Sequence, residues 1–149
     1  HVAGLLREAE LPPAQVELEI TESVFMGDSE RTVALLNDFR ALGVSLAMDD
    51  FGTGYSSLSY LRRFPLDTIK LDHFFVQRVH NQSVSQSLVL AIIAVARALN
   101  LHIVAEGVED ADDDAFLTQH GVDERQGYLF AHPMPAALLE RWLDARSRL

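Results

Sequence analysis

The chain has 149 residues, a formal net charge of −10, no cysteine, and 48% hydrophobic against 23% charged residues. This balance is typical of a globular domain with a real core. The acidic charge argues against binding along the phosphate backbone of DNA or RNA, which requires a basic face, and the lack of cysteine excludes disulfides and thiolate metal sites.

Segments typical of strands and of helices alternate along the chain, which predicts βα units and a parallel sheet. Helices are expected at 1–9, 29–42, 74–80, 83–99, 110–119 and from 136 onward, with a short helix carrying Leu58, Leu61 and Phe64. Strands are expected at 16–21, 44–49, 68–72, 101–106 and 125–128. The longest apolar run, 88–96, is too short to span a bilayer and is typical of a buried helix.

Each expected strand carries a polar or charged residue at or near its carboxyl end. Successive strand side chains point to opposite faces. One face is apolar, and the other ends in Glu19, Asp49, Lys70, Glu106 and Gln126. A TIM-type barrel presents its active site at the carboxyl rim of its strands in this way. The sequence therefore predicts an α/β fold of the TIM-type (β/α) barrel kind.

The pair Asp49-Asp50, followed by Phe51 and the loop Gly52-Thr53-Gly54, is the strongest local signal. Adjacent carboxylates repel each other unless a cation lies beside them. Hard oxygen ligands of this kind suit Mg²⁺ or Mn²⁺. Taken alone, the pair also fits a helix N-cap or a solvated turn.

Several motifs together carry a family resemblance. They are Glu19-Ile20-Thr21-Glu22-Ser23, the stretch from Asp49 to Leu58, Phe64-Pro65-Leu66-Asp67 leading to Lys70-Leu71-Asp72, Ala105-Glu106-Gly107-Val108-Glu109, and Gln126-Gly127-Tyr128-Leu129-Phe130. In order and spacing the chain resembles the EAL domain, a bacterial phosphodiesterase that hydrolyses cyclic di-GMP to linear pGpG. The Glu-Ala-Leu motif that names the family, and its metal-binding asparagine, are not in this sequence.

The resemblance implies a site for two Mg²⁺ or Mn²⁺ ions. Glu19, Asp49 and Asp50 would be metal ligands, and Glu106 would be a ligand or the general base. Lys70 would orient the attacking water or stabilise phosphate charge; its alternative is a structural ion-pair partner, and one lysine can fill both roles. Gln126 would hold a water or a phosphate oxygen. The alternative for Glu19 is a plain ion pair with Lys70.

Further roles follow from the same resemblance. Glu22 would anchor the loop Gly52-Thr53-Gly54, Asp72 would support the ligands, and Glu109 would contact guanine. The alternative for Glu109 is an acid in the first turn of a helix. The run Asp112-Asp113-Asp114 is interpreted as helix N-terminal charge on a solvated surface.

The resemblance also predicts a context. The chain is expected to be the carboxyl-terminal part of an EAL domain, with about five of the eight barrel strands, inactive and poorly folded alone. The parent would be a cytoplasmic phosphodiesterase, with a membrane tether in its other segments left open. An upstream GGDEF or sensor domain and a homodimer near the glycine loop are the expected partners, besides cyclic di-GMP. The alternative function is a non-catalytic receptor for cyclic di-GMP.

Overall fold

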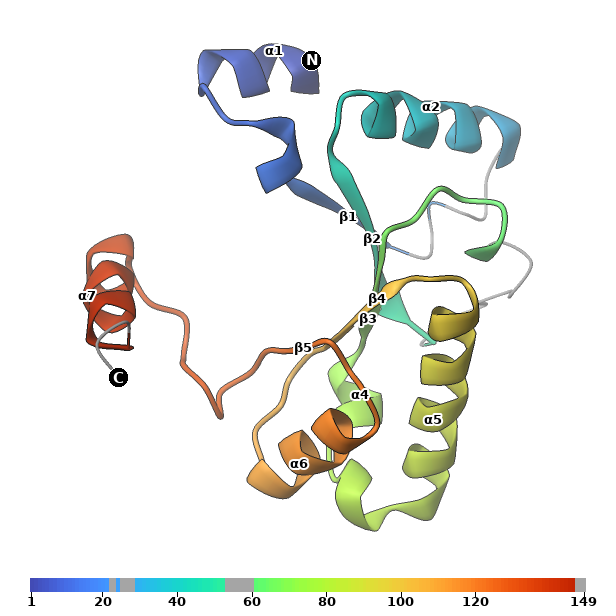
Figure 1. The fold of residues 1–149 in the computed structure, drawn as a ribbon, viewed down its shortest axis with the longest axis vertical. Helices are drawn as coiled ribbons and strands as arrows, with labels where there is room; N and C mark the ends of the chain where they lie inside the picture. The colour runs from blue at the N-terminus through green and yellow to red at the C-terminus, as the bar shows by residue number, and fades with distance from the viewer. Residues whose placement is uncertain (22–23, 25–28, 53–60, 147–149) are drawn as a thin grey trace.

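The structure is a computed structural model that describes residues 1–149 except 22–23, 25–28, 53–60 and 147–149. Its centre is a parallel sheet in which the strands lie in sequence order, β1-β2-β3-β4-β5 (Figure 1). The strands are β1 Glu17–Thr21, β2 Ser45–Phe51, β3 Thr68–Leu71, β4 His102–Ala105 and β5 Glu124–Arg125. The expected parallel α/β arrangement is therefore confirmed, and the carboxyl ends of all five strands lie at one edge.

Helices connect the strands as the sequence predicts. They are α1 Val2–Glu8, α2 Ser29–Ala41, α4 His73–Val76, α5 Ser83–Ala98, α6 Ala111–Gln119 and α7 Ala136–Arg146, with 3₁₀ turns at Pro13–Gln15 and Val79–Asn81. Asp72 caps α4 by accepting a hydrogen bond from Phe74 N at 2.9 Å. The short helix expected around Leu58 lies mostly outside the described residues.

Two expected elements are shorter than predicted. A helix was expected over 74–80, but α4 is a single turn, and Arg78 adopts a left-handed φ of 58°. The backbone N–H groups of Arg78 and His80 donate to the Asp113 carboxylate instead of to helical carbonyls. A tertiary hydrogen bond thus outweighs the local preference for helix. The strand expected at 125–128 is reduced to β5.

The core lies between the sheet and the helices that pack on it, and α5 is the longest of these helices. The strand β3 is buried along its whole length, and Leu46, Ile69, Leu71 and Ile103 are fully buried. Burial of each such side chain contributes roughly 1.5–3 kcal/mol. On α5, the residues that pack into this core are Val89, Ile93 and Ala96. The centre of the sheet is therefore a rigid support for the groups at its carboxyl edge.

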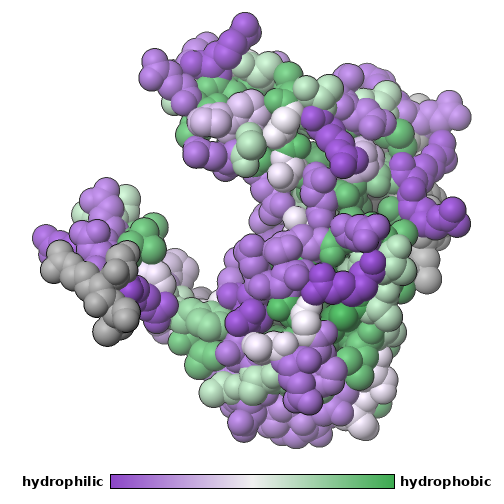
Figure 2. All heavy atoms as spheres, in the orientation of Figure 1, coloured by the Kyte–Doolittle hydropathy of each residue, from purple (hydrophilic) through white to green (hydrophobic). Residues whose placement is uncertain are grey.

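The helix α7 stands apart from the sheet at the end of an extended segment (Figure 1). It has no buried residue, and Leu138, Leu139 and Leu143 are half exposed. Figure 2 shows hydrophobic atoms at the surface both on α7 and along the segment that leads to it. In the part of the chain that the structure describes, no helix has the length and apolar character needed to cross a bilayer.

Candidate active site

Lys70 lies at the centre of a group of carboxylates from neighbouring strands. Its ammonium contacts Glu19 Oε1 on β1 and lies 2.6 Å from Glu106 Oε1 and 3.4 Å from Asp49 Oδ1 on β2. The parallel register pairs Lys70 with Val104, two residues before Glu106, so the carboxyl ends of the strands meet here. The Lys70 side chain is only 8% exposed, whereas Glu19 is half exposed. Water therefore screens the ion pairs of Lys70 with Asp49 and Glu106 less than its pair with Glu19.

Asp49 and Asp50 both reach this centre because the sheet is irregular at that point. The register between β2 and β3 shifts between Met48 and Phe51, and Asp50 has a left-handed φ of 53°. A bulge of this kind turns consecutive side chains away from strict alternation. As a result, one carboxylate oxygen from each of Asp49, Asp50 and Glu106 lies within 4.8 Å of the other two.

The charges at this centre are unbalanced. Burial of the Lys70 ammonium acts to lower its pKa, but hydrogen bonds with Glu106 and Glu19 and the charge of Asp49 outweigh burial and raise the pKa of Lys70. The pKa of Asp50 is also raised, first by burial and then by the neighbouring carboxylates Asp49 and Asp72. One ammonium therefore compensates several carboxylates, and negative charge is left over.

The residues present fit a divalent cation. In the part of the chain that the structure describes, Asp49 Oδ1 is buried and accepts no hydrogen bond, and the cation that it faces is the Lys70 ammonium at 3.4 Å. A buried carboxylate oxygen without a hydrogen bond is costly unless a cation binds it. The candidate ligand set of Asp49, Asp50 and Glu106 consists of carboxylates, the ligands that Mg²⁺ and Mn²⁺ prefer.

A hollow adjoins the carboxylates, and Gln126 links the two. Gln126 Nε2 donates to Glu106 Oε1 at 2.7 Å, and Gln126 also lines the hollow, which has a volume of about 630 Å³. The lining residues are largely aromatic or apolar and include His73, Tyr128, His132, Met134 and Trp142. Tyr128 and His132 stack, with ring centroids 4.2 Å apart. A flat organic ring could lie in this space while a linked anion reached the carboxylate centre.

Comparison with known families decides the assignment: a model of the EAL domain matches residues 1–133. The chain belongs to the EAL domain family. Curated relatives include the cyclic di-GMP phosphodiesterase PdeR of Escherichia coli K12, 54% identical over 138 residues, and the cyclic di-GMP phosphodiesterase NbdA of Pseudomonas aeruginosa, 47% identical over 145 residues. These matches cover 93% and 97% of this chain but 21% and 18% of the relatives, so the chain spans about a fifth of their length.

Solved EAL structures share the fold. The EAL domain of Mycobacterium smegmatis DcpA has a TM-score of 0.91 and 42% identity, covering 97% of this chain and 65% of that one. The PaMucR phosphodiesterase in complex with c-di-GMP has a TM-score of 0.87 and 43% identity, covering 93% and 56%. Klebsiella pneumoniae BlrP1 with manganese and cyclic di-GMP has a TM-score of 0.82 and 36% identity, covering 89% and 34%. The predicted family and the EAL type of barrel are thereby confirmed.

The remaining residues that the EAL resemblance singles out are placed as follows. Asp72 is buried, binds His73 Nδ1 at 3.0 Å and lies close enough to Asp50 to raise its pKa. Gly52 has a left-handed φ of 94°, and a Cβ there would lie 2.9 Å from the Phe75 ring. Glu109 lies before the cap of α6 and lines the hollow, so the alternative of a first-turn helix acid is wrong. Glu22, Thr53 and Gly54 lie outside the described residues.

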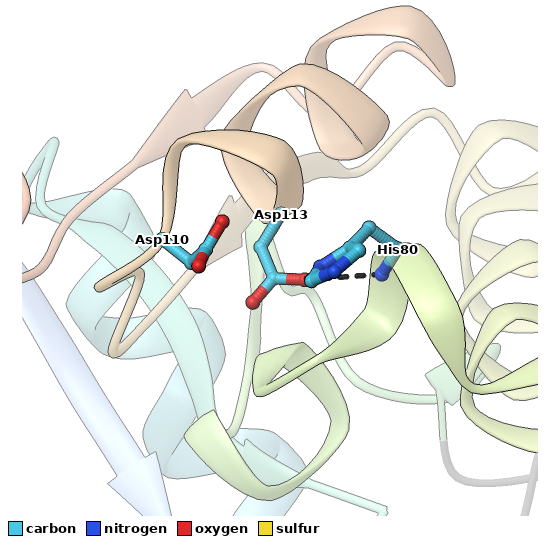
Figure 3. A group of neighbouring side chains, drawn as sticks. All are labelled: His80, Asp110 and Asp113. Atoms are coloured by element: carbon cyan, nitrogen blue, oxygen red, sulfur yellow. Dashed lines mark hydrogen bonds and ion pairs between the residues drawn. The ribbon is translucent and has the colours of Figure 1, made fainter.

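A second cluster of titratable side chains supports the fold. It consists of His80, Asp110 and Asp113 (Figure 3). The Asp113 carboxylate accepts hydrogen bonds from Arg78 N at 2.9 Å, His80 N at 3.0 Å and His80 Nδ1 at 2.7 Å. The hydrogen bond with Asp113 raises the pKa of His80, against partial desolvation. The interpretation of 112–114 as solvated surface is therefore wrong for Asp113, which is buried. Its carboxylate fixes the turn that follows α4.

The aromatic lining of the hollow was not foreseen from the sequence. His73, His132 and Trp142 belong to none of the motifs that carry the EAL resemblance. The one available signal was their position, since His73 follows the third strand directly and Tyr128 and His132 follow Gln126 closely. Trp142 reaches the hollow from α7, which is distant in sequence from the lining residues His73, Gly107 and Glu109. Sequence periodicity does not reveal such a contact.

Proposed function

We propose that the EAL domain containing this chain hydrolyses cyclic di-GMP to linear pGpG in a reaction that requires Mg²⁺ or Mn²⁺. The observation that carries the proposal is the convergence of Asp49, Asp50 and Glu106 around the buried Lys70 at the carboxyl edge of the sheet. The names of the relatives PdeR and NbdA support it. The manganese and cyclic di-GMP complex of BlrP1 supports the choice of metal and substrate.

The metal ions would be held by Asp49 and Asp50, with Glu19 and Glu106 as further ligands. Bound divalent ions acidify a water molecule and neutralise charge on a phosphodiester. This supply of positive charge matters here because the chain carries a net charge of −10 and would otherwise repel an anionic substrate.

Different side chains of this chain would then carry out different parts of the reaction. Glu106 would accept the proton of the attacking water, in addition to or in place of its role as a metal ligand; its side chain is partly exposed, and Gln126 donates a hydrogen bond to it. The water oxygen would form a bond to phosphorus while the bond from phosphorus to the leaving sugar oxygen breaks, which opens the ring, and the leaving oxygen would take up a proton, from solvent or from the carboxyl that accepted the proton of the water. The Lys70 ammonium would stabilise the charge that develops on the phosphate oxygens.

The hollow beside Gln126 would take one guanine base. Its aromatic lining by Tyr128, His132 and Trp142 suits stacking with a base. Glu109 is exposed at the same hollow and could accept hydrogen bonds from guanine N–H groups. The substrate's phosphate would lie on the Gln126 side, toward the carboxylates.

The chain would be one part of a larger protein. We place it in a larger cytoplasmic protein, in which the rest of the EAL domain supplies the other strands and metal ligands. The absence of cysteine fits a reducing compartment. An upstream GGDEF-type domain is supported by the relative MucR, named a bifunctional diguanylate cyclase and cyclic di-GMP phosphodiesterase and 45% identical to this chain. Homodimerisation near the glycine loop stays a prediction.

The test is a hydrolysis assay on the full-length protein that carries this chain. We expect conversion of cyclic di-GMP to pGpG with Mn²⁺ or Mg²⁺, and loss of conversion in Asp49→Asn. The control variant is Asp112→Asn, which changes an exposed carboxylate outside the site. Binding of cyclic di-GMP by wild type without turnover under any metal would support the receptor alternative instead.

A further inference from the structure

The Lys70 ammonium lies among several carboxylates, as a bound metal ion would. Its ammonium contacts carboxylates from three different segments, Glu19, Asp49 and Glu106, and its side chain is 8% exposed. Of the twelve basic residues in the chain, counting Lys and Arg, it is the one lysine. An ammonium is a compact point charge on a flexible stem, so it can sit among several carboxylates and change partners, unlike the rigid guanidinium fork.

The same carboxylates are the candidate metal ligands. Among the described residues, Asp49 Oδ1 accepts no hydrogen bond and pairs with the Lys70 ammonium at 3.4 Å, and Glu106 Oε1 is shared between Lys70 and Gln126 Nε2. Without Lys70 these groups would face each other at short range with no positive charge among them. Such a cluster would move apart or take up protons.

We propose that Lys70 is the internal counter-ion of the metal-free centre: it holds Asp49 and Glu106 in position for metal and gives up part of its contact with them on loading. This inference rests on the proposed function, because it assumes that these carboxylates bind metal. It assigns Lys70 a positioning role in the free protein, before any substrate is present. Lys70 then competes with the metal for the carboxylates that it arranges.

Two opposite effects follow from removing the ammonium. The metal-free protein should lose stability, because a partly buried carboxylate cluster loses its cation. The affinity for a divalent metal should rise, because the site gains net negative charge and no longer has an internal competitor. A lysine that served only the phosphate of the substrate would produce neither effect.

The experiment compares wild type, Lys70→Met and the control Arg97→Met in the full-length protein, without substrate. Arg97 also loses an ion pair, with Asp123 at 2.9 Å, but at the opposite end of β4, where Asp123 accepts from Ile103 N. Metal-free Tm is measured by calorimetry after chelation, and Mn²⁺ binding is titrated by electron paramagnetic resonance. We expect Lys70→Met to lower the metal-free Tm by about 5 °C or more.

The Mn²⁺ dissociation constant of Lys70→Met should fall by at least about fivefold, the factor that one unit-charge interaction at close contact gives in bulk water, where screening is strongest. Arg97→Met should leave it unchanged. Equal or weaker Mn²⁺ binding by Lys70→Met, with wild type binding Mn²⁺, would overturn this inference and leave the proposed function standing. No Mn²⁺ binding by wild type would overturn the proposed function and this inference with it.

A double variant covers the case in which Lys70→Met does not fold. Lys70→Met with Glu19→Gln removes one positive and one negative charge together, and Glu19 contacts Lys70 directly. Recovery of the metal-free Tm in the double variant would support charge compensation. A double variant as unstable as the single one would overturn it, because packing and not charge would then be the role of Lys70.

Discussion

The buried carboxylate of Asp113 offers a quantitative test of how the site is supported. Asp113→Ala removes the acceptor for the backbone N–H groups of Arg78 and His80 and for His80 Nδ1. Hydrogen bonds to a charged group contribute about 1.5–3 kcal/mol each when well buried. Because the Asp113 carboxylate is buried but its partner His80 is partly exposed, we expect a total loss of about 3 kcal/mol in the free energy of local opening.

The consequence should reach the active site, because the turn fixed by Asp113 directly follows α4. This helix carries Phe75, which packs against Gly52, and it is capped by Asp72. Hydrogen exchange measured by mass spectrometry on the full-length protein can follow peptides that cover 73–82. About 3 kcal/mol corresponds to roughly a hundredfold faster exchange in Asp113→Ala. Asp112→Ala, an exposed neighbour, is the matched control.

The effect should also depend on pH. The pKa of His80 is raised by Asp113, so protonated His80 adds stability that is fully present below its ordinary pKa of about 6.5. That contribution is lost as pH rises through the raised value in the folded protein. The difference between wild type and Asp113→Ala should therefore be larger at pH 6 than at pH 9. Wild-type exchange in Asp113→Ala, or a difference that grows with pH, would refute the reasoning.

Three further predictions concern the chemistry and the packing of the site. Asp49→Asn and Glu106→Gln should each abolish hydrolysis, because both keep the shape of the side chain but remove a metal ligand or a proton acceptor. The far-ultraviolet circular dichroism should stay unchanged. Turnover at the wild-type rate in either variant would show that other residues carry the chemistry. Chelation should stop turnover, Mn²⁺ or Mg²⁺ should restore it, and Ca²⁺ should inhibit because it prefers longer and looser coordination; turnover that survives chelation would contradict the metal mechanism. Gly107→Ala should lower both Tm and activity. Gly107 has a left-handed φ of 67°, and a Cβ at this position would lie 2.5 Å from His73 Cβ. An unchanged Tm would show that the backbone relaxes there.

Much of this protein follows from its sequence alone. Period-two alternation next to helical periodicity predicts the parallel sheet and the order of its elements, because each strand must bury one face under a helix. The same alternation predicts that Glu19, Lys70 and Glu106 project to one side at the carboxyl edge. The motifs identify the EAL family, which the match over 1–133 confirms.

Other features are decided only by tertiary structure. Asp49 and Asp50 are consecutive, so alternation would send them to opposite faces, and a bulge against β3 is what lets both carboxylates reach Glu106. The helix expected over 74–80 ends early because a carboxylate 33 residues away accepts the N–H of His80. Local propensity acts over a few residues, whereas these outcomes depend on groups that only the folded chain brings together.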